Sequence, residues 1–217
     1  MPSDALRNPT PGSVDGMELT ETGTDGVTRC NWGNGTAEYA AYHDNEWGRP
    51  VDDDQRLFEK LSLEGFQSGL SWITILRKRA SFREVFAGFD IERVARFDEE
   101  DIRRMLGDAR IVRHEGKIRS AINNAHRSLD VVDEMGSFGA LVWSFEPPPA
   151  PPMHAATTPE SVALAKELKR RGFTFVGPTT AYAFMQSMGI VNDHAEACAV
   201  RDAVEADRAR FVRPQPR

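Results

Sequence analysis

Apolar side chains along this chain recur mostly at intervals of three or four residues rather than at alternate positions, which predicts helices and few strands. Between residues 54 and 68 they form one stripe of an amphipathic helix. A second apolar segment, residues 70–79, ends in basic side chains that suit a helix C-terminus. Residues 81–84 begin with serine and end with glutamate, a capping-box pattern that predicts a further short helix through residue 86.

Capping residues predict where later helices begin. Asp90 and Asp98 are predicted N-caps of two short helices, and residues 117–129 are predicted to form a longer one. Residues 147–152, five prolines and one alanine, predict an extended loop rather than helix interior. After this loop, Thr158 is the predicted N-cap of a helix with proline at its first position.

The helix that begins after Thr158 is predicted to end at Gly172, and the next to run from Thr179 or Thr180 to Met188. Glycines bound the short turn between them and permit backbone conformations that other residues resist. Free N–H groups and the helix dipole at the start of the second helix favour an anion such as a DNA phosphate. An ordinary packed helical hairpin is the alternative. If DNA binds, we expect contacts to its backbone from Lys169, Arg171, Gly172, Val176, Gly177 and Thr179.

The chain has 217 residues, 40% of them hydrophobic, which suits one substantial domain or two small ones. Residues 1–28 are rich in Pro, Gly, Ser, Thr and Asp and predict a flexible tail. Aromatic residues are frequent from residue 29 onward, so we expect an all-α domain over residues 29–200 and a C-terminal extension over 201–217. No apolar run reaches membrane-spanning length and no secretory segment is visible, so a cytoplasmic protein without membrane contact is expected.

The formal net charge of −6 argues against a nucleic-acid partner, but the distribution of charge qualifies this argument. Basic side chains gather at residues 77–79, 110–119 and 166–171. Such clusters are commonly solvated helix faces, and a phosphate-binding surface is the alternative.

Both cysteines of the chain have a histidine nearby in the sequence. His194 and Cys198 are predicted to share one face of a final helix capped at residue 192 or 193, because they are four positions apart. Cys30 and His43 supply two more ligands near the other end of the chain. Two thiolates and two imidazoles favour a closed structural zinc site. The alternative is two buried free cysteines and two hydrogen-bonded histidines.

Glu64 continues the apolar stripe of the helix predicted over residues 54–68, so its carboxylate should be partly buried and needs hydrogen-bond donors. A salt bridge to a local arginine would satisfy it. Alternatively, Glu64 is an acid in a pocket that accepts hydrogen bonds from a ligand. Trp72 follows eight residues later and is a plausible wall of the same pocket.

Four segments, 42–48, 63–72, 170–177 and 191–194, read YHDNEWG, LEGFQSGLSW, RRGFTFVG and VNDH. In this order and spacing they resemble the 3-methyladenine DNA glycosylase I family, and the resemblance extends from about Cys30 to Cys198. The proline-rich loop at 147–152 departs from the family's usual connection.

The resemblance implies a helix-hairpin-helix DNA glycosylase fold with a structural zinc ion that joins the N- and C-terminal segments. Its ligands would be Cys30, His43, His194 and Cys198. The resemblance also implies that Glu64 is the catalytic carboxylate of a base pocket. The aromatic residues around the base would be Tyr42, Trp72, Trp47, Tyr39 and Trp32. Asp193 belongs to the family's own Asn-Asp-His run and receives no catalytic role.

The implied activity is base excision repair by a monofunctional glycosylase without lyase activity. It would flip 3-methyladenine out of alkylated double-stranded DNA, hydrolyse its glycosidic bond and release the free base. Phosphate contacts would position the enzyme without reading sequence. A monomer is expected. The alternative is a non-enzymatic, zinc-stabilised DNA-binding module that lacks a base pocket.

Overall fold

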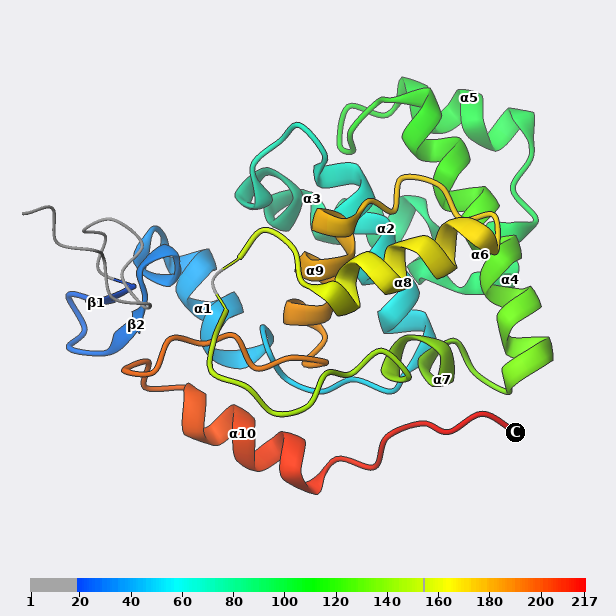
Figure 1. Cartoon of the computed structure of the whole chain (residues 1–217). Helices are drawn as coiled ribbons and strands as arrows, with labels where there is room; N and C mark the ends of the chain where they lie inside the picture. Colours follow the sequence, from blue (N-terminus) through cyan, green and yellow to red (C-terminus); the bar gives the residue numbers. More distant parts are fainter. Residues whose placement is uncertain (1–18, 154) are drawn as a thin grey trace, which may run out of the picture.

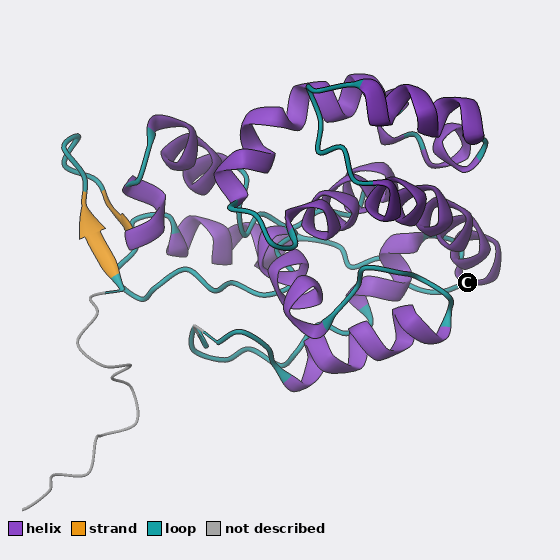
Figure 2. Ribbon diagram, turned by 90° about the horizontal axis from the view of Figure 1, so that it is seen from above, coloured by secondary structure: helices purple, strands orange, loops and turns teal. Residues whose placement is uncertain are grey.

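A computed structural model describes residues 19–153 and 155–217 of the chain. The described part is mostly helical and carries one small antiparallel hairpin, β1–β2, at its N-terminal side (Figures 1 and 2). The elements are β1 Thr20–Thr22, β2 Thr28–Cys30, the 3-10 helix η1 Asn31–Asn34, α1 Ala37–Asn45, α2 Asp54–Gln67, α3 Trp72–Val85, the 3-10 helix η2 Ala87–Phe89, α4 Ile91–Ala95, α5 Glu99–Gly107, α6 Glu115–Met135, α7 Phe138–Trp143, α8 Pro159–Arg170, α9 Pro178–Ser187 and α10 Arg201–Arg210. None of the helices in the described ranges is long and apolar enough to cross a membrane.

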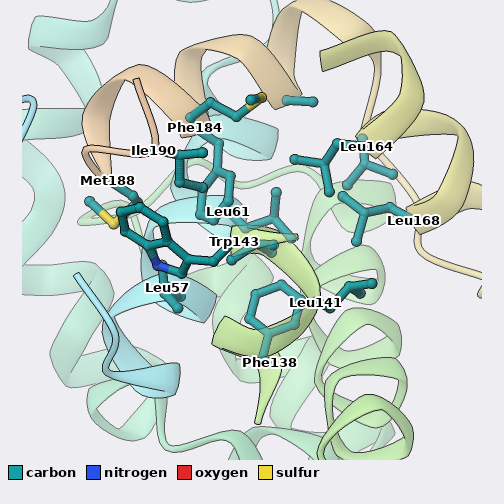
Figure 3. Close-up of a cluster of buried hydrophobic side chains, with 14 of the residues drawn as sticks. Leu57, Leu61, Phe138, Leu141, Trp143, Leu164, Leu168, Phe184, Met188 and Ile190 are labelled. Carbon is teal, nitrogen blue, oxygen red and sulfur yellow. The ribbon is translucent and has the colours of Figure 1, made fainter. Parts of the chain in front are cut away.

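Helix α2 lies between two hydrophobic cores. Leu57 and Leu61 belong to the first core, which α7, α8 and α9 complete (Figure 3). Phe58, Leu63 and Phe66 belong to the second, together with side chains of α3 to α6. Because neighbours cover α2 on both sides, its whole middle is buried, including polar side chains that the amphipathic pattern alone does not place inside. These are Glu59, Lys60, Ser62 and Glu64.

Several predicted helix starts are confirmed by their caps. The Asp90 side chain accepts from the amide of residue 93 at the start of α4, and Asp98 forms a capping box at α5. Thr158 caps α8, which has proline at its first position. These starts depend on hydrogen bonds within four residues, so the sequence is enough to find them.

Other predicted boundaries are wrong. The serine at position 81 lies inside α3, which continues unbroken to Val85, so no helix begins there. Helix α6 is longer than predicted, from a cap at His114 to a left-handed glycine at position 136, and α7 was not predicted. Helix α9 begins at Pro178 with Gly177 as its cap, ahead of the predicted threonines. Proline suits this first position because its missing N–H has no helical partner there.

The final helix also differs from the prediction. His194 and Cys198 lie in the irregular segment between α9 and α10, and the helix begins only at Arg201. The prediction that they share one face of a helix is therefore wrong, although both side chains are buried. Helix α10 belongs to the predicted C-terminal extension. It packs against the domain through Val204, and the guanidinium of Arg208 donates to the carbonyl of Gly189.

The N-terminal hairpin was not predicted either. Strands β1 and β2 pair in the register Thr20 to Cys30, within and just beyond the segment expected to be a flexible tail. Residues 1–18 of that expected tail lie outside the described residues. The hairpin matters for the site because β2 ends at Cys30 and its side chain is buried there.

Candidate functional site

Four side chains from both ends of the domain meet in one buried cluster. The ligand atoms of Cys30, His43, His194 and Cys198, hereafter the Cys/His cluster, all lie within 4.8 Å of one another. Sγ of Cys30 is 3.8 Å from Nδ1 of His194, and Sγ of Cys198 is 3.5 Å from both Nδ1 of His194 and Nε2 of His43. The predicted ligands thus converge, although two of them come from a loop.

The second nitrogen of each histidine ring has its own partner. Nδ1 of His43 is 2.8 Å from the Asp44 carboxylate, which Arg29 holds through two hydrogen bonds from its Nε and one from its Nη2. Nε2 of His194 is 3.1 Å from the carbonyl oxygen of Trp47. Each ring therefore directs its remaining nitrogen into the cluster, the usual arrangement around metal-bound histidine.

The donor set and its spacing fit a tetrahedral metal ion. Two sulfurs and two nitrogens around zinc would lie about 3.6 Å apart along an S–N edge, from bond lengths of roughly 2.3 and 2.05 Å. The observed edges of 3.5 to 3.8 Å agree with this value. A hydrogen bond between the two thiols lowers the pKa of Cys198 and raises that of Cys30, so the pair readily supplies one thiolate, and a bound metal would displace the remaining thiol proton. The cluster can hold a metal that joins the N- and C-terminal segments.

Beside the Cys/His cluster lies a cavity of 440 Å³, hereafter the aromatic cavity. Every residue predicted to surround a base lines it: Trp32, Tyr39, Tyr42, Trp47, Glu64 and Trp72. Two of these lie next to metal-ligand candidates, one in the sequence and one in space. Tyr42 directly precedes His43, and the Trp47 ring lies edge-on against the His194 ring, with centroids 4.6 Å apart. The cluster therefore holds one wall of the aromatic cavity in place.

Glu64 is 5% exposed and lies at the wall of the aromatic cavity, one helical turn after Lys60 on α2. Its Oε1 is 2.7 Å from Nζ of Lys60, which also donates to the hydroxyl oxygen of Tyr42 at 2.9 Å. The buried carboxylate thus has a lysine partner instead of the arginine that sequence reasoning offered as one possibility. Burial raises the pKa of Tyr42 well above its usual value, so its hydroxyl keeps its proton.

Trp72 begins α3 and forms another wall of the aromatic cavity. The Lys60 ammonium lies 3.3 Å from the centre of its ring, in cation–π contact. Among the described residues, its indole N–H is buried and has no hydrogen-bond partner. Buried donors are normally satisfied, so this one favours a water or a ligand nearby.

Two other carboxylates, Glu46 and Asp193, also have side-chain partners. Glu46 pairs with Arg79 through two hydrogen bonds. Asp193 lines the aromatic cavity, but it accepts hydrogen bonds from Tyr182, Gln186 and the amide of residue 153. Among these carboxylates, Glu64 is the one that pairs with a lysine of the cavity wall.

Helices α8 and α9 pack side by side, joined by the turn at residues 171–177 (Figure 1). Gly172 has a φ of +87°, and its carbonyl accepts from Asn123 of α6. The side chain of Asn124 bonds both the amide and the carbonyl of Thr174. Helix α6 therefore holds the turn in a fixed shape.

The residues predicted to contact a DNA backbone lie on or near this turn, in different settings. Lys169 is exposed, whereas the guanidinium of Arg171 pairs with Glu134 and Glu167. The Val176 side chain is buried in the first core, which leaves its backbone for any contact. Gly172 and Thr179 are exposed, and Gly177 is half-buried.

Lys60 is a charged residue of the cavity wall that sequence reasoning missed. Its position four residues before Glu64 was a usable signal, since residues at this spacing meet on a helix. A lysine on a helix is ordinarily exposed, however, and only the burial of α2 on both sides brings this one inside.

A buried carboxylate in the wall of an aromatic cavity, carried by a mostly helical domain, suits a flat, polar, aromatic ligand such as a nucleobase. Residues 32–202 match the model of the methyladenine glycosylase family. DNA-3-methyladenine glycosylase 1 of Escherichia coli (strain K12) is 47% identical over 179 residues, which cover 79% of this chain and 96% of that protein. The corresponding glycosylase of Haemophilus influenzae is 44% identical over 79% of this chain and 97% of its own.

Solved structures agree with these relatives. A crystal structure of a 3-methyladenine DNA glycosylase I, 47% identical, superposes with a TM-score of 0.75 over 79% of this chain and 98% of its own. The Staphylococcus aureus enzyme, described for its recognition of 3-methyladenine, is 32% identical and superposes with a TM-score of 0.76, covering 80% and 96%. The chain belongs to the methyladenine glycosylase family.

Proposed function

We propose that this protein is a DNA repair glycosylase that flips 3-methyladenine out of alkylated double-stranded DNA and hydrolyses its glycosidic bond. The observation that carries the proposal is the buried carboxylate of Glu64 in the wall of the aromatic cavity. Its relatives of 47% and 44% identity bear this activity in their names. A cavity of 440 Å³ is large enough for one purine base.

Recognition of the base would use the charge of the lesion and its polar edge. In DNA, 3-methyladenine is a cation, and aromatic rings attract a cation more strongly than a neutral base when water is excluded. Trp72 would stack on the base, with Tyr42 and Trp47 as further walls and Trp32 and Tyr39 at the periphery. Glu64 would accept hydrogen bonds from the edge of the base.

Chemistry at the bond needs little help, because the methylated base is a good leaving group. The C1′–N9 bond breaks and its electron pair leaves with the base, which becomes neutral. Positive charge moves to the sugar, where Glu64 would stabilise it electrostatically. Water then adds at C1′ and loses a proton. No step of this reaction forms a covalent adduct between a lysine and the sugar, so the enzyme would be monofunctional.

DNA binding would use α8, the turn and α9 as a helix-hairpin-helix unit. The amides of Gly177 and Thr179 lie at the start of α9, where the helix dipole favours a phosphate. Lys169, Arg171, Gly172 and Val176 would complete this contact to the backbone. Such contacts position the protein on DNA of any sequence, as a search for damage requires.

The Cys/His cluster would hold zinc in a structural role. Its four protein ligands would complete a tetrahedral shell and leave no open position for water or substrate. The domain assigned to residues 29–200 would be held together at this point, and the extension over 201–217 packs against it.

The test is release of bases from DNA treated with a methylating agent, with 3-methyladenine and 7-methylguanine separated by chromatography. Glu64→Gln should lower 3-methyladenine release about tenfold or more, the scale of losing one electrostatic contact to a transition state. Glu59→Gln is the matched control, since Glu59 is on the same helix but pairs with Arg83. If Glu64→Gln releases 3-methyladenine at the wild-type rate, Glu64 has no part in the reaction. If the wild-type protein releases no base, the alternative of a non-enzymatic DNA-binding module is favoured.

A further inference from the structure

Lys117 lies in the first turn of α6 and carries a buried ammonium group. The residue is 7% exposed, and its Nζ donates to the carbonyl oxygens of Phe66 at 2.9 Å and of Ser68 at 2.6 Å. Burial lowers the pKa of Lys117. Within residues 19–153 and 155–217, no carboxylate pairs with this ammonium. A buried charge is costly, so its position on these two carbonyls needs an explanation.

Both carbonyls belong to the C-terminal end of α2. The helix ends at Gln67 and Ser68 is its C-cap, so the last carbonyls have no amide of the helix as a donor. The helix dipole also concentrates negative charge at this end, which favours a cation. Lys117 therefore caps α2, and the chain continues into a turn through Gly69, whose φ is +80°.

The turn at residues 68–71 joins the two cavity residues that have the main roles in the proposed function. Glu64 lies in the last turn of α2, and Trp72 is the first residue of α3. Both line the aromatic cavity. The position of the Trp72 ring relative to the Glu64 carboxylate therefore depends on the shape of this turn, and Lys117 ties the turn to α6.

The same face of α6 also holds the hairpin turn at residues 171–177. Ser120 and Asn124 follow Lys117 at spacings of three and four, so the three buried side chains share one face of the helix. The Ser120 hydroxyl donates to the carbonyl of Thr174, and the Asn124 side chain bonds both the carbonyl and the amide of Thr174. One helix therefore sets the distance between the proposed contact to the DNA backbone and the aromatic cavity.

We propose that Lys117 is a positioning residue, which keeps Glu64 and Trp72 at the spacing that a flipped base needs. This inference rests on the proposed function of the cavity as a base pocket. The hairpin places the DNA backbone, α6 links the hairpin to the turn at 68–71, and the turn places the carboxylate and the ring around the base. A displacement of about 1 Å in a reacting geometry can lower a rate about 100-fold. A loosened turn therefore slows base release far more than it weakens the contact of the hairpin with DNA.

Lys117→Met keeps a straight side chain of similar length and removes both hydrogen bonds. We expect the single-turnover rate of 3-methyladenine release from methylated duplex DNA to fall about tenfold or more. The Kd for undamaged duplex DNA, measured by fluorescence anisotropy, should stay within about twofold of the wild-type value, because the hairpin is untouched. A Kd that weakens as much as the rate falls would assign Lys117 to DNA binding and refute the inference.

Lys78→Met is the matched control. Lys78 also donates to two carbonyls, those of residues 109 and 110, but it does not line the aromatic cavity. This variant should release the base at the wild-type rate. Lys117→Gln keeps a donor for one of the two carbonyls, so its rate should lie between those of the wild-type protein and Lys117→Met. All rates are measured well below the melting temperature of each variant.

A double-mutant cycle separates positioning from general stability. If Lys117 acts through Glu64, the fold-loss of rate caused by Lys117→Met should be about threefold or more smaller in a Glu64→Gln background, because the group that it positions is gone. A purely structural lysine would lower the melting temperature and either leave the rate unchanged or cause equal losses in both backgrounds, and each of these results refutes the inference. Should Lys117→Met fail to fold, Lys117→Gln takes its place in the cycle. If the wild-type protein releases no base, the proposed function is refuted and this role with it.

Discussion

Replacing Cys198 with alanine removes one of four ligands from the Cys/His cluster and opens the link between the two ends of the domain. The link from Cys30 to Cys198 closes a loop of about 170 residues. A cross-link of that length stabilises a folded chain by about 5 kcal/mol through the entropy of the unfolded state. For a protein of this size, that loss lowers the melting temperature by about 10 to 20 °C.

The measurement is a calorimetric melt of the wild-type protein and of Cys198→Ala, with metal content determined by atomic emission. We expect about one zinc per wild-type chain and a large decrease in the variant. A strong chelator should move the wild-type melting temperature toward that of the variant, because a bound metal contributes its binding energy to folding.

His126→Ala is the matched control. His126 is exposed on α6, outside the cluster, so its loss should leave the melting temperature and the zinc content unchanged. The reasoning fails if the purified wild-type protein holds no metal and Cys198→Ala melts within about 2 °C of it. In that case the four side chains are hydrogen-bonded thiols and imidazoles only.

Three further predictions concern packing, pH and chemistry. Leu61→Ala empties space in the first core between α2 and the α8–α9 pair and should cost about 2 to 5 kcal/mol, measured by urea unfolding. Hydrogen bonds from Arg170 lower the pKa of Glu167 to about 2, so its contribution to stability is complete above its unfolded pKa of 4.5 and is lost as pH falls toward 2; in an NMR titration, Arg170→Met should raise this pKa. Borohydride added during base release should trap no protein–DNA adduct, because Glu64 and Tyr42 hold Nζ of Lys60; a trapped adduct would contradict monofunctional chemistry.

Local signals in the sequence predicted the elements that depend on local contacts. The caps Asp90, Asp98 and Thr158 act within four residues, and each marks the start of a helix. The serine-to-glutamate pattern at 81–84 predicted a helix start that is not there, because such a local pattern does not show whether the preceding chain is already helical. A capping box stabilises a helix start only where the preceding chain leaves the helix, and here α3 runs on through it.

In the site too, some features could be predicted from the sequence and others could not. Residue type and the family resemblance predicted the metal ligands and the aromatic residues, and the structure brings each group together. The prediction that one helix carries both His194 and Cys198 was wrong. Ligands can converge on one point from an irregular segment as well as from a helix, so their convergence did not require that helix. Lys60 was missed because its burial depends on elements far from it in the sequence, on both sides of α2.

The late position of one half of the Cys/His cluster has a consequence for the order of synthesis. Tyr42 and Trp47 are synthesised early, but His194, whose ring packs against Trp47, follows about 150 residues later. Ala183 and Gln186 of the cavity wall are also synthesised late. A ribosome adds roughly 5 to 20 residues per second, so the nascent chain spends roughly 7 to 30 seconds without a complete cavity. An unfinished chain therefore has no competent pocket, and base excision begins only when nearly the whole polypeptide has left the ribosome.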